Sequence, residues 1–234
     1  MLRMTRSASR KVGLMERIWL AFILVVLLVS SACAAWAAPS FRGYTGLVKV
    51  PSANTLDTGE FSFGVMTEGT DKFQANDAFA TYGIGGQVEL GVDSFQPFGA
   101  KDRKTLVNAK YRFSRDSGHK SGYAIGIIDA ANEVQQTGYI VATKSIVRRT
   151  SIFASVVSSV RGHIGLGVGG LNGVFAGLSV FAGNRVVFSA EWDSKDVNLG
   201  FRLTPIRGLR LHAAVLDVGN RDDLGVGMSY TRTY

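Results

Sequence analysis

The sequence has few of the residues that build covalent or metal-held frameworks: its 234 residues include one cysteine, three histidines and four prolines. A single cysteine excludes a disulfide framework, and with so few histidines a Cys/His zinc site is excluded as well. Beyond residue 38, no apolar run approaches the ~18 residues of a transmembrane helix. The chain does contain 46% apolar residues and 28 glycines. This composition excludes a disordered chain and indicates tight turns or closely packed strands.

The first 37 residues are typical of an export signal. A basic stretch over residues 1–17 is followed by the unbroken apolar run 18–29. The tripeptide 35–37 (AWA) then has the small-x-small spacing that signal peptidase needs. We therefore expect residues 1–37 to be a signal peptide and the mature chain to begin near Ala38.

Two other interpretations of this region are weaker. An uncleaved anchor over residues 18–38 is nearly long enough to span ~30 Å of hydrocarbon, but the apolar run is short and ends in small residues. Lipid modification of Cys33 would need a bulky aliphatic residue shortly before it, where the chain has residues 30–32 (SSA). Loss of the only cysteine with the signal suits an oxidising compartment outside the inner membrane.

The net charge of +8 includes a contribution from this signal. After residue 37, 21 basic and 17 acidic residues remain, which is a net charge of +4. The strongest basic cluster belongs to the signal, and no recognition motif accompanies the rest. A nucleic-acid-binding function is therefore excluded.

The rest of the chain alternates apolar and polar residues with a period of two, which is typical of β-strands. The strongest segments are 60–67, 86–94, 105–113, 185–193, 197–204 and 224–234, and weaker ones are 76–84, 121–129, 137–144, 149–158, 173–182 and 209–218. Residues 43–50 are a candidate for one more strand. We predict one all-β domain over residues 60–234, an antiparallel β-barrel of about 12 strands (range about 10–14), with residues 38–59 leading into it.

The polar face of these segments distinguishes a membrane barrel from a soluble sandwich or lipocalin-like barrel. A solvent-facing surface would carry charges and few glycines, whereas this face combines glycines with charges of both signs. That mixture suits the narrow interior of a transmembrane barrel, whose closed sheet satisfies its own backbone inside hydrocarbon. Aromatic residues near segment ends would then form interfacial girdles rather than a soluble core. They are Tyr111, Phe113, Tyr123, Tyr139, Trp192, Tyr230 and Tyr234.

The polar positions of the alternating segments are expected to face the barrel interior, here called the inward phase, and they place ionic side chains in the lumen. Three acids and four bases are available for a near-neutral network, which offsets the cost of removing them from bulk water. We therefore expect a plugged or very narrow pore. The residues of this predicted network are Glu89, Asp93, Lys110, Arg112, Glu191, Arg202 and Arg210.

The C-terminal segment 224–234 (LGVGMSYTRTY) ends on an aromatic residue. With Tyr230 and Tyr234 on its apolar face, it resembles the terminal-strand signal that the outer-membrane barrel assembly machinery reads. Arg232 departs from that pattern, but so near the end it can snorkel to the interface. The export signal, the dyad pattern and this ending together predict the outer membrane of a diderm bacterium, with membrane lipid and the assembly machinery as partners.

No residue set indicates catalysis, a cofactor or a metal. His119 and His163 lie in Gly-rich stretches and are expected in solvated loops, whereas His212 shares the inward phase and is expected in a lumen hydrogen-bond network. A lipid-acting hydrolase would need its Ser/His pair to face lipid. This enzyme class is therefore the weakest of the functional alternatives.

Two further segments leave alternatives open. Glu191, Asp193 and Asp196 form an acidic cluster that could bind Ca²⁺ or sugar hydroxyls, or could belong to a salt-bridge network at the barrel rim with nearby Lys and Arg side chains. Residues 51–54 (PSAN) are either a turn before the first strand or a segment that folds into the barrel mouth.

Residues 44–60 (YTGLVKVPSANTLDTGE) resemble the opening Gly-Leu-Ile-x-x-Pro-x-Ala…Gly segment of the YjbH-like proteins, outer-membrane barrels associated with exopolysaccharide production. The similarity continues in order through 107–113, 123–129, 139–144, 173–177, 191–203 and the ending. It implies a non-enzymatic role in producing or secreting surface polysaccharide, with polysaccharide or other export proteins as partners, and no catalytic residues. A small porin or structural barrel is the alternative function.

Overall fold

The computed structural model describes residues 37–70, 73–117, 119–148 and 157–232. Within these residues the chain forms twelve β-strands. They are β1 (Phe61–Thr70), β2 (Phe73–Ile84), β3 (Val88–Gln96), β4 (Lys104–Ser114), β5 (Gly122–Ile128), β6 (Thr137–Arg148), β7 (Val157–Val168), β8 (Gly173–Ala182), β9 (Val186–Trp192), β10 (Val197–Ile206), β11 (Leu209–Leu216) and β12 (Asp223–Arg232).

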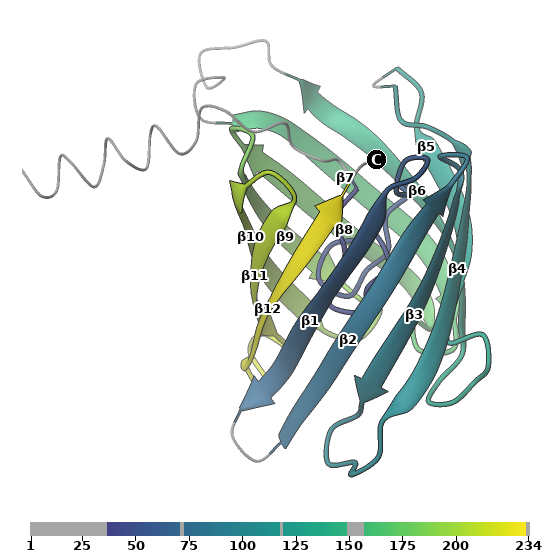
Figure 1. The fold of residues 1–234 in the computed structure, drawn as a ribbon. Coiled ribbons are helices and arrows are strands. Elements are labelled where there is room, and N and C mark those ends of the chain that lie inside the picture. Colours follow the sequence, from purple (N-terminus) through teal and green to yellow (C-terminus); the bar gives the residue numbers. More distant parts are fainter. Residues whose placement is uncertain (1–36, 71–72, 118, 149–156, 233–234) are drawn as a thin grey trace, which may run out of the picture.

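The strands close into a barrel in which each strand pairs antiparallel with its neighbours in sequence (Figure 1). Closure joins β1 to β12, in a register that pairs Phe61 with Arg232 and Glu68 with Gly225. Because no strand edge stays open, the ladder satisfies the backbone polar groups without water. The predicted fold, an antiparallel transmembrane β-barrel of about 12 strands, is confirmed.

The alternating pattern determines which side chains face lipid. On β3, Leu90 and Val92 are exposed, whereas Glu89 and Asp93 on the opposite phase are buried in the lumen. Other strands repeat this arrangement and build an apolar outer belt, as hydrocarbon requires. The belt includes Phe63, Val65, Val107, Ile125, Ile140, Ile164, Leu166, Val174, Phe188, Leu199, Val226 and Met228.

One expected strand falls mostly outside the described residues and one is wrong. Of the predicted strand 149–158, residues 149–156 lie outside the described residues, and the described seventh strand covers Val157–Val168. Residues 43–50 form bends with isolated bridges in place of an extra strand. The glycines within residues 162–167 are typical of a turn, but in the structure they lie in β7. Neighbouring residues pack so closely against them that a larger side chain would have little room. A Cβ on Gly165 would lie 2.2 Å from the ring of Phe175.

The predicted aromatic girdle needs one correction. Tyr139 is buried in the lumen at 5% exposure, whereas Phe113 and Tyr123 stack on the outer face with ring centroids 5.9 Å apart. Tyr111 and Trp192 are also exposed. Tyr230 packs against Phe63 at 5.8 Å on the same outer face, and Tyr234 lies outside the described residues.

The chain before β1 folds into the barrel. Residues 37–56, here called the plug, are buried or half-buried, and Figure 1 shows this purple segment coiled inside the strands. Residues 57–60 then turn into β1, with a left-handed φ of 76° at Gly59. Of the two alternatives for residues 51–54, the structure therefore has the segment inside the barrel. The predicted signal peptide lies outside the described residues except for Ala37, and no helix within the described ranges could cross a bilayer.

Candidate functional site

The plug has little regular structure of its own, so its backbone polar groups need partners elsewhere. A few internal hydrogen bonds shape it, such as Phe41 N to Val48 O at 2.8 Å and Leu47 N to Val50 O at 2.9 Å. Most other buried backbone groups must be paired by the wall, because an unpaired one costs about as much as a lost hydrogen bond. Ionic and polar side chains of the barrel supply these partners.

Glu191 of β9 holds the tip of the plug. Its carboxylate accepts the backbone N–H groups of Val48 (2.9 Å), Lys49 (2.7 Å) and Val50 (3.1 Å). The side-chain amide of Asn198 on β10 donates to the same carboxylate at 3.1 Å. Hydrogen bonds from several N–H groups stabilise a buried carboxylate, so this contact anchors the plug to one wall.

Glu89 and Lys110 hold the plug from the opposite wall. Glu89 of β3 accepts the N–H of Thr45 at 2.9 Å and that of Leu56 at 3.0 Å. The Nζ of Lys110 on β4 donates to the carbonyls of Thr45 (2.6 Å) and Asn54 (3.2 Å), and it lies 3.5 Å from Glu89. Each charge thus has both an ionic partner and hydrogen bonds, as a buried pair needs.

Two arginines bind plug carbonyls. Arg202 of β10 donates through Nη2 to the carbonyl oxygens of Pro39 (3.0 Å), Gly46 (3.3 Å) and Leu47 (3.2 Å). Arg210 of β11 donates to Ala37 O at 3.4 Å and also to the Thr231 hydroxyl. Guanidinium groups suit this role because one planar group carries five donors.

Apolar contacts complete the seal. Phe41 and Val48 of the plug form one buried cluster with Met66, Phe79, Ala214 and Leu216 of the wall. Val50 and Ala53 form a second cluster with Tyr139, Phe175 and other wall residues, which explains why Tyr139 points inward. A gap beside Phe41 and His212 has a volume of only about 10 Å³. This is at the lower limit for a single water molecule, so plug and wall are in close contact here.

The structure places all seven residues of the predicted network on the lumen side, but it arranges them differently from the expectation that they pair with one another. Four of them bind plug residues after the predicted cleavage site, and Arg210 binds Ala37, the last residue of the predicted signal peptide. Arg112 instead binds Gly86 O in the β2–β3 turn, and Asp93 accepts a 2.5 Å hydrogen bond from Asn108. Within the described residues, Lys110–Glu89 is the ion pair that joins two of the seven.

The wall also uses polar residues that were not predicted. The hydroxyl of Thr143 on β6 accepts the N–H of Ala53 at 2.9 Å, and the hydroxyl of Thr81 on β2 donates to Gly43 O at 2.9 Å. Asn198, which supports Glu191, belongs to the same group. All three side chains lie at inward-facing positions of their strands, so the alternating pattern of the sequence could have identified them.

The histidines have three different environments. His119 is exposed, as expected for a loop. His163 is buried on β7, where its ring nitrogens lie 2.9 Å from Thr143 Oγ1 and 3.2 Å from Ser179 Oγ, so the expected solvated loop is wrong. His212 faces the lumen, with Nε2 2.8 Å from Ser229 Oγ and Nδ1 3.4 Å from Arg202 Nε. Both serine–histidine contacts face the lumen, the opposite side from a lipid substrate.

The acidic cluster at the end of β9 and in the loop after it is divided. Glu191 binds the plug, whereas Asp193 caps its own loop by accepting the N–H groups of Lys195 (3.2 Å) and Asp196 (2.9 Å). At Asp196, desolvation and then the carboxylates of Asp217 and Asp193 raise the pKa. No group of three or more His, Cys, Asp or Glu side chains in the described part of the chain is placed to hold a metal ion.

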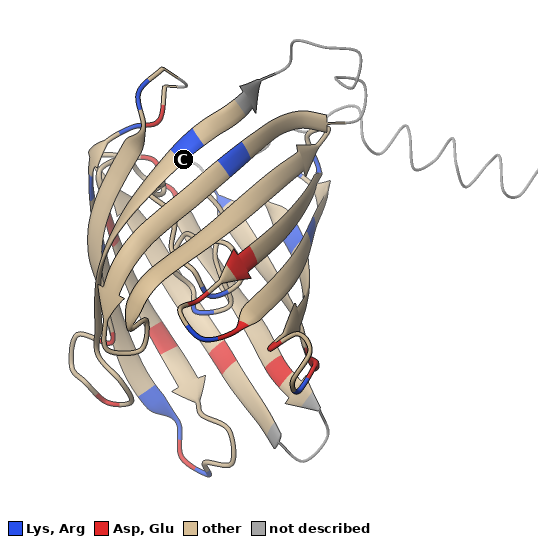
Figure 2. Cartoon of the chain, turned by 180° about the vertical axis from the view of Figure 1, so that it is seen from behind, with Lys and Arg blue, Asp and Glu red and all other residues tan. Residues whose placement is uncertain are grey.

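Charges inside the barrel are unevenly distributed along its axis, with Glu89 at the start of β3 as an acid on the more basic side. Arg112, Arg161 and Arg210 lie near strand ends on the side where β1 begins and β12 ends, whereas Glu68 and Glu191 lie near the opposite ends. Figure 2 shows blue bands mostly toward the end with the C-terminus and red bands mostly toward the other.

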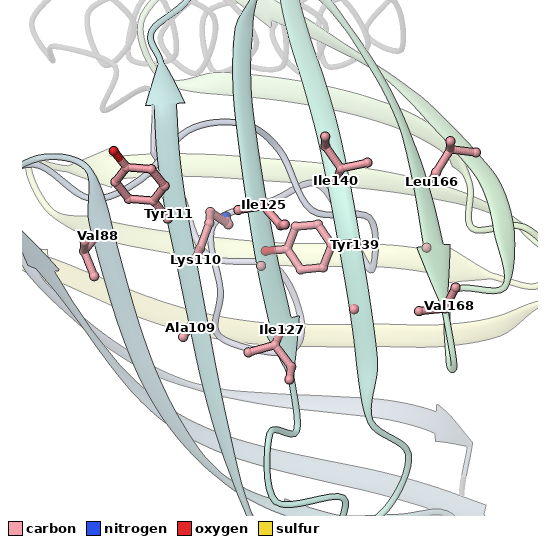
Figure 3. Close-up of a pocket in the computed structure, with 13 residues that line it drawn as sticks. Val88, Ala109, Lys110, Tyr111, Ile125, Ile127, Tyr139, Ile140, Leu166 and Val168 are labelled. Atoms are coloured by element: carbon pink, nitrogen blue, oxygen red, sulfur yellow. The ribbon is translucent and has the colours of Figure 1, made fainter.

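The outer wall of β4–β7 carries an apolar hollow of about 780 Å³ (Figure 3). It forms because the outward residues Ala109 and Gly138 are small beside Tyr111, Ile140 and Leu166. The hollow is continuous with the apolar belt and lies on the other side of the sheet from the plug. It is therefore separate from the lumen site.

Comparison with solved structures shows likeness to bacterial porins. The KdgM porin, alone and in complex with disordered oligogalacturonate, has a TM-score of 0.53 and 12% sequence identity, covering 72% of this chain and 98% of that chain. The low-pH structure of Pseudomonas putida OprB has a TM-score of 0.34 and 8% identity, covering 74% of this chain and 91% of that one. No protein-family model matches, and neither does any curated protein sequence. The likeness to KdgM is one of fold alone: both chains form closed antiparallel β-barrels.

Proposed function

We propose that this protein is a porin-type channel of the outer membrane whose lumen is kept closed by its own N-terminal segment. The observation that carries the proposal is the plug, whose backbone beyond the predicted cleavage site is bound by four ionic wall side chains: Glu89, Lys110, Glu191 and Arg202. The apolar outer belt and the porin-like fold support the location. Opening then requires the plug to leave the wall, so that small hydrophilic solutes can pass.

Conductance in planar bilayers tests this proposal. The unmodified protein should show little basal conductance, because plug and wall are in close contact. Glu191→Ala and Arg202→Ala should each raise conductance, because they leave plug N–H or carbonyl groups unpaired and weaken the closed state. Large, steady channels from the unmodified protein would contradict the proposal.

Two exposed variants serve as controls. Glu133→Ala and Arg221→Ala remove one acid and one base from loops, where the side chains of Glu133 and Arg221 are 45% and 58% exposed. Their ion-pair partners are Lys104 for Glu133 and Asp217 and Asp223 for Arg221, and none of these residues belongs to the plug. Both variants should conduct as little as the unmodified protein.

A second candidate is a role in exopolysaccharide secretion, as the resemblance to YjbH-like proteins implies. The observation that favours it is that residues 44–56, within the segment 44–60 that carries the resemblance, belong to the plug. A deletion strain separates the two. Lost surface polysaccharide would support secretion, whereas unchanged polysaccharide with lower small-solute uptake would support the porin.

A further inference from the structure

An acidic pocket lies on one side of the lumen, away from the contacts that hold the plug tip. Glu68 of β1, Asp77 of β2 and Asp93 of β3 face inward from neighbouring strands and are 1%, 3% and 1% exposed. Phe95 of β3 pairs with Asp77 in the sheet register and lies on the same face. Three carboxylates and an aromatic ring thus meet in one buried region.

Arg42 of the plug occupies this pocket. Its Nη2 lies 3.2 Å from Glu68 Oε2, and its guanidinium carbon lies 4.0 Å above the centroid of the Phe95 ring. Asp77 and Asp93 are both within electrostatic reach of the same guanidinium. Lys49 approaches more distantly, with Nζ 3.9 Å from the same Glu68 oxygen.

The pocket has more acceptor capacity than Arg42 uses. Both carboxylate oxygens of Asp77, Oε1 of Glu68 and Oδ1 of Asp93 are buried without a hydrogen-bond partner among the described residues. Buried carboxylates are costly unless they are paired, so several such oxygens aimed into one pocket indicate a site for further N–H donors.

We propose that Glu68, Asp77, Asp93 and Phe95 form a binding site for organic cations of the guanidinium and primary-amine class, and that Arg42 is its internal occupant in the closed channel. Carboxylates facing an aromatic ring suit such cations, because the ring adds a cation–π contact that a planar guanidinium exploits. The described acids are not arranged around a metal ion. An external cation therefore competes with Arg42 for the same atoms.

Binding is tested by removing the internal occupant. Arg42→Ala should bind methylguanidinium or agmatine about tenfold more tightly than the unmodified protein, because its site no longer needs to be vacated. Calorimetry and the ligand-dependent rise in unfolding temperature of detergent-folded protein both measure this. Sodium chloride at the same ionic strength should have no such effect.

Two variants show whether the response belongs to the pocket. Arg42→Ala combined with Asp77→Asn should lose the tighter binding, and Arg221→Ala should bind no better than the unmodified protein. Equal affinity in Arg42→Ala and the unmodified protein, or a response that survives Asp77→Asn, would overturn the proposal. If Arg42→Ala does not refold, Arg42→Gln provides the same comparison, since it keeps a long side chain but removes the cation from the site.

The idea that Arg42 helps to close the channel rests on the proposed function. The affinity for organic cations, measured by calorimetry or by the unfolding temperature, does not depend on it. Raised conductance of Arg42→Ala, lowered again by methylguanidinium, would support both. Cation binding without any conductance in any variant would leave the site standing and contradict the porin. Conductance that rises in Glu191→Ala, together with no cation binding, would support the porin and overturn the site.

Discussion

Glycines on the lumen face mark where the plug presses against the barrel wall. A Cβ on Gly177 would lie 2.5 Å from Leu47 Cδ2, and one on Gly225 would lie 2.8 Å from Phe41 Cε1. Apolar plug side chains therefore fill the space that a Cβ at these glycines would take. The sequence pattern placed these glycines on the polar face of the strands but did not show which side chains would pack against them.

Gly177→Val should displace the plug without removing any of its hydrogen bonds. Overpacking of this kind costs about 1–3 kcal/mol, so we expect lower stability in urea and higher conductance in bilayers. The matched control is Gly138→Val on the outer face, where a Cβ would meet Val168 at an ordinary 3.5 Å. If the two variants behave alike, the plug does not press on Gly177.

At the scale of elements, the same arrangement occurs twice in the barrel. Asn108 of β4 accepts the backbone N–H of Asp129 at 2.9 Å, and Asn198 of β10 accepts that of Asp217 at 3.1 Å. Both aspartates follow the next strand and have left-handed φ values of 55° and 54°. Each asparagine also donates its amide to carboxylates of the preceding strand or loop. These asparagines thus join three consecutive parts of the chain.

Asn198→Ala should loosen both the plug anchor and the loop after β11. The substitution removes one hydrogen-bond partner from the N–H of Asp217 and one from the carboxylate of Glu191. Leaving a buried polar group without its partner costs about 1–3 kcal/mol of folding free energy. Hydrogen exchange of residues 217–222 should become faster, and the unfolding temperature should fall. The exposed Asn172 is the control, and Asn172→Ala should change neither measurement.

At the scale of the whole molecule, the apolar belt makes the barrel depend on a membrane. Val65 lies near the middle of β1 and is 52% exposed on the lipid face. Val65→Arg should therefore destabilise the lipid-embedded barrel by about 2–4 kcal/mol. Val218→Arg, in the loop after β11, should have little effect, and unfolding in lipid vesicles compares the two.

The same belt predicts the behaviour of the purified protein. Refolded in detergent, it should show β structure by circular dichroism and should migrate differently on a gel before and after heating, because the closed barrel resists unfolding. A water-soluble monomer without detergent would be incompatible with an apolar outer face of this extent.

The alternation in the sequence was enough to predict the barrel, since a period of two assigns residues to faces wherever apolar and polar positions differ. At 88–93, for example, apolar residues alternate strictly with Glu, Gly and Asp, and the faces follow directly. The same rule put Glu191 and Arg202 in the lumen. At 139–142 (YIVA), however, four apolar residues follow one another, so the inward position of Tyr139 could not be read from the pattern.

The sequence by itself thus determined the strand number, the lipid-facing belt and the inward charges, because these depend on local periodicity. Only the tertiary structure decided what the charges bind. The plug forms no regular strand, and its partners Glu191 and Arg202 are more than 140 residues away along the chain. Its backbone N–H and C=O groups bind the wall acids and bases, and closure of the barrel brings these groups within hydrogen-bond distance. The lumen charges therefore bind the plug more than one another.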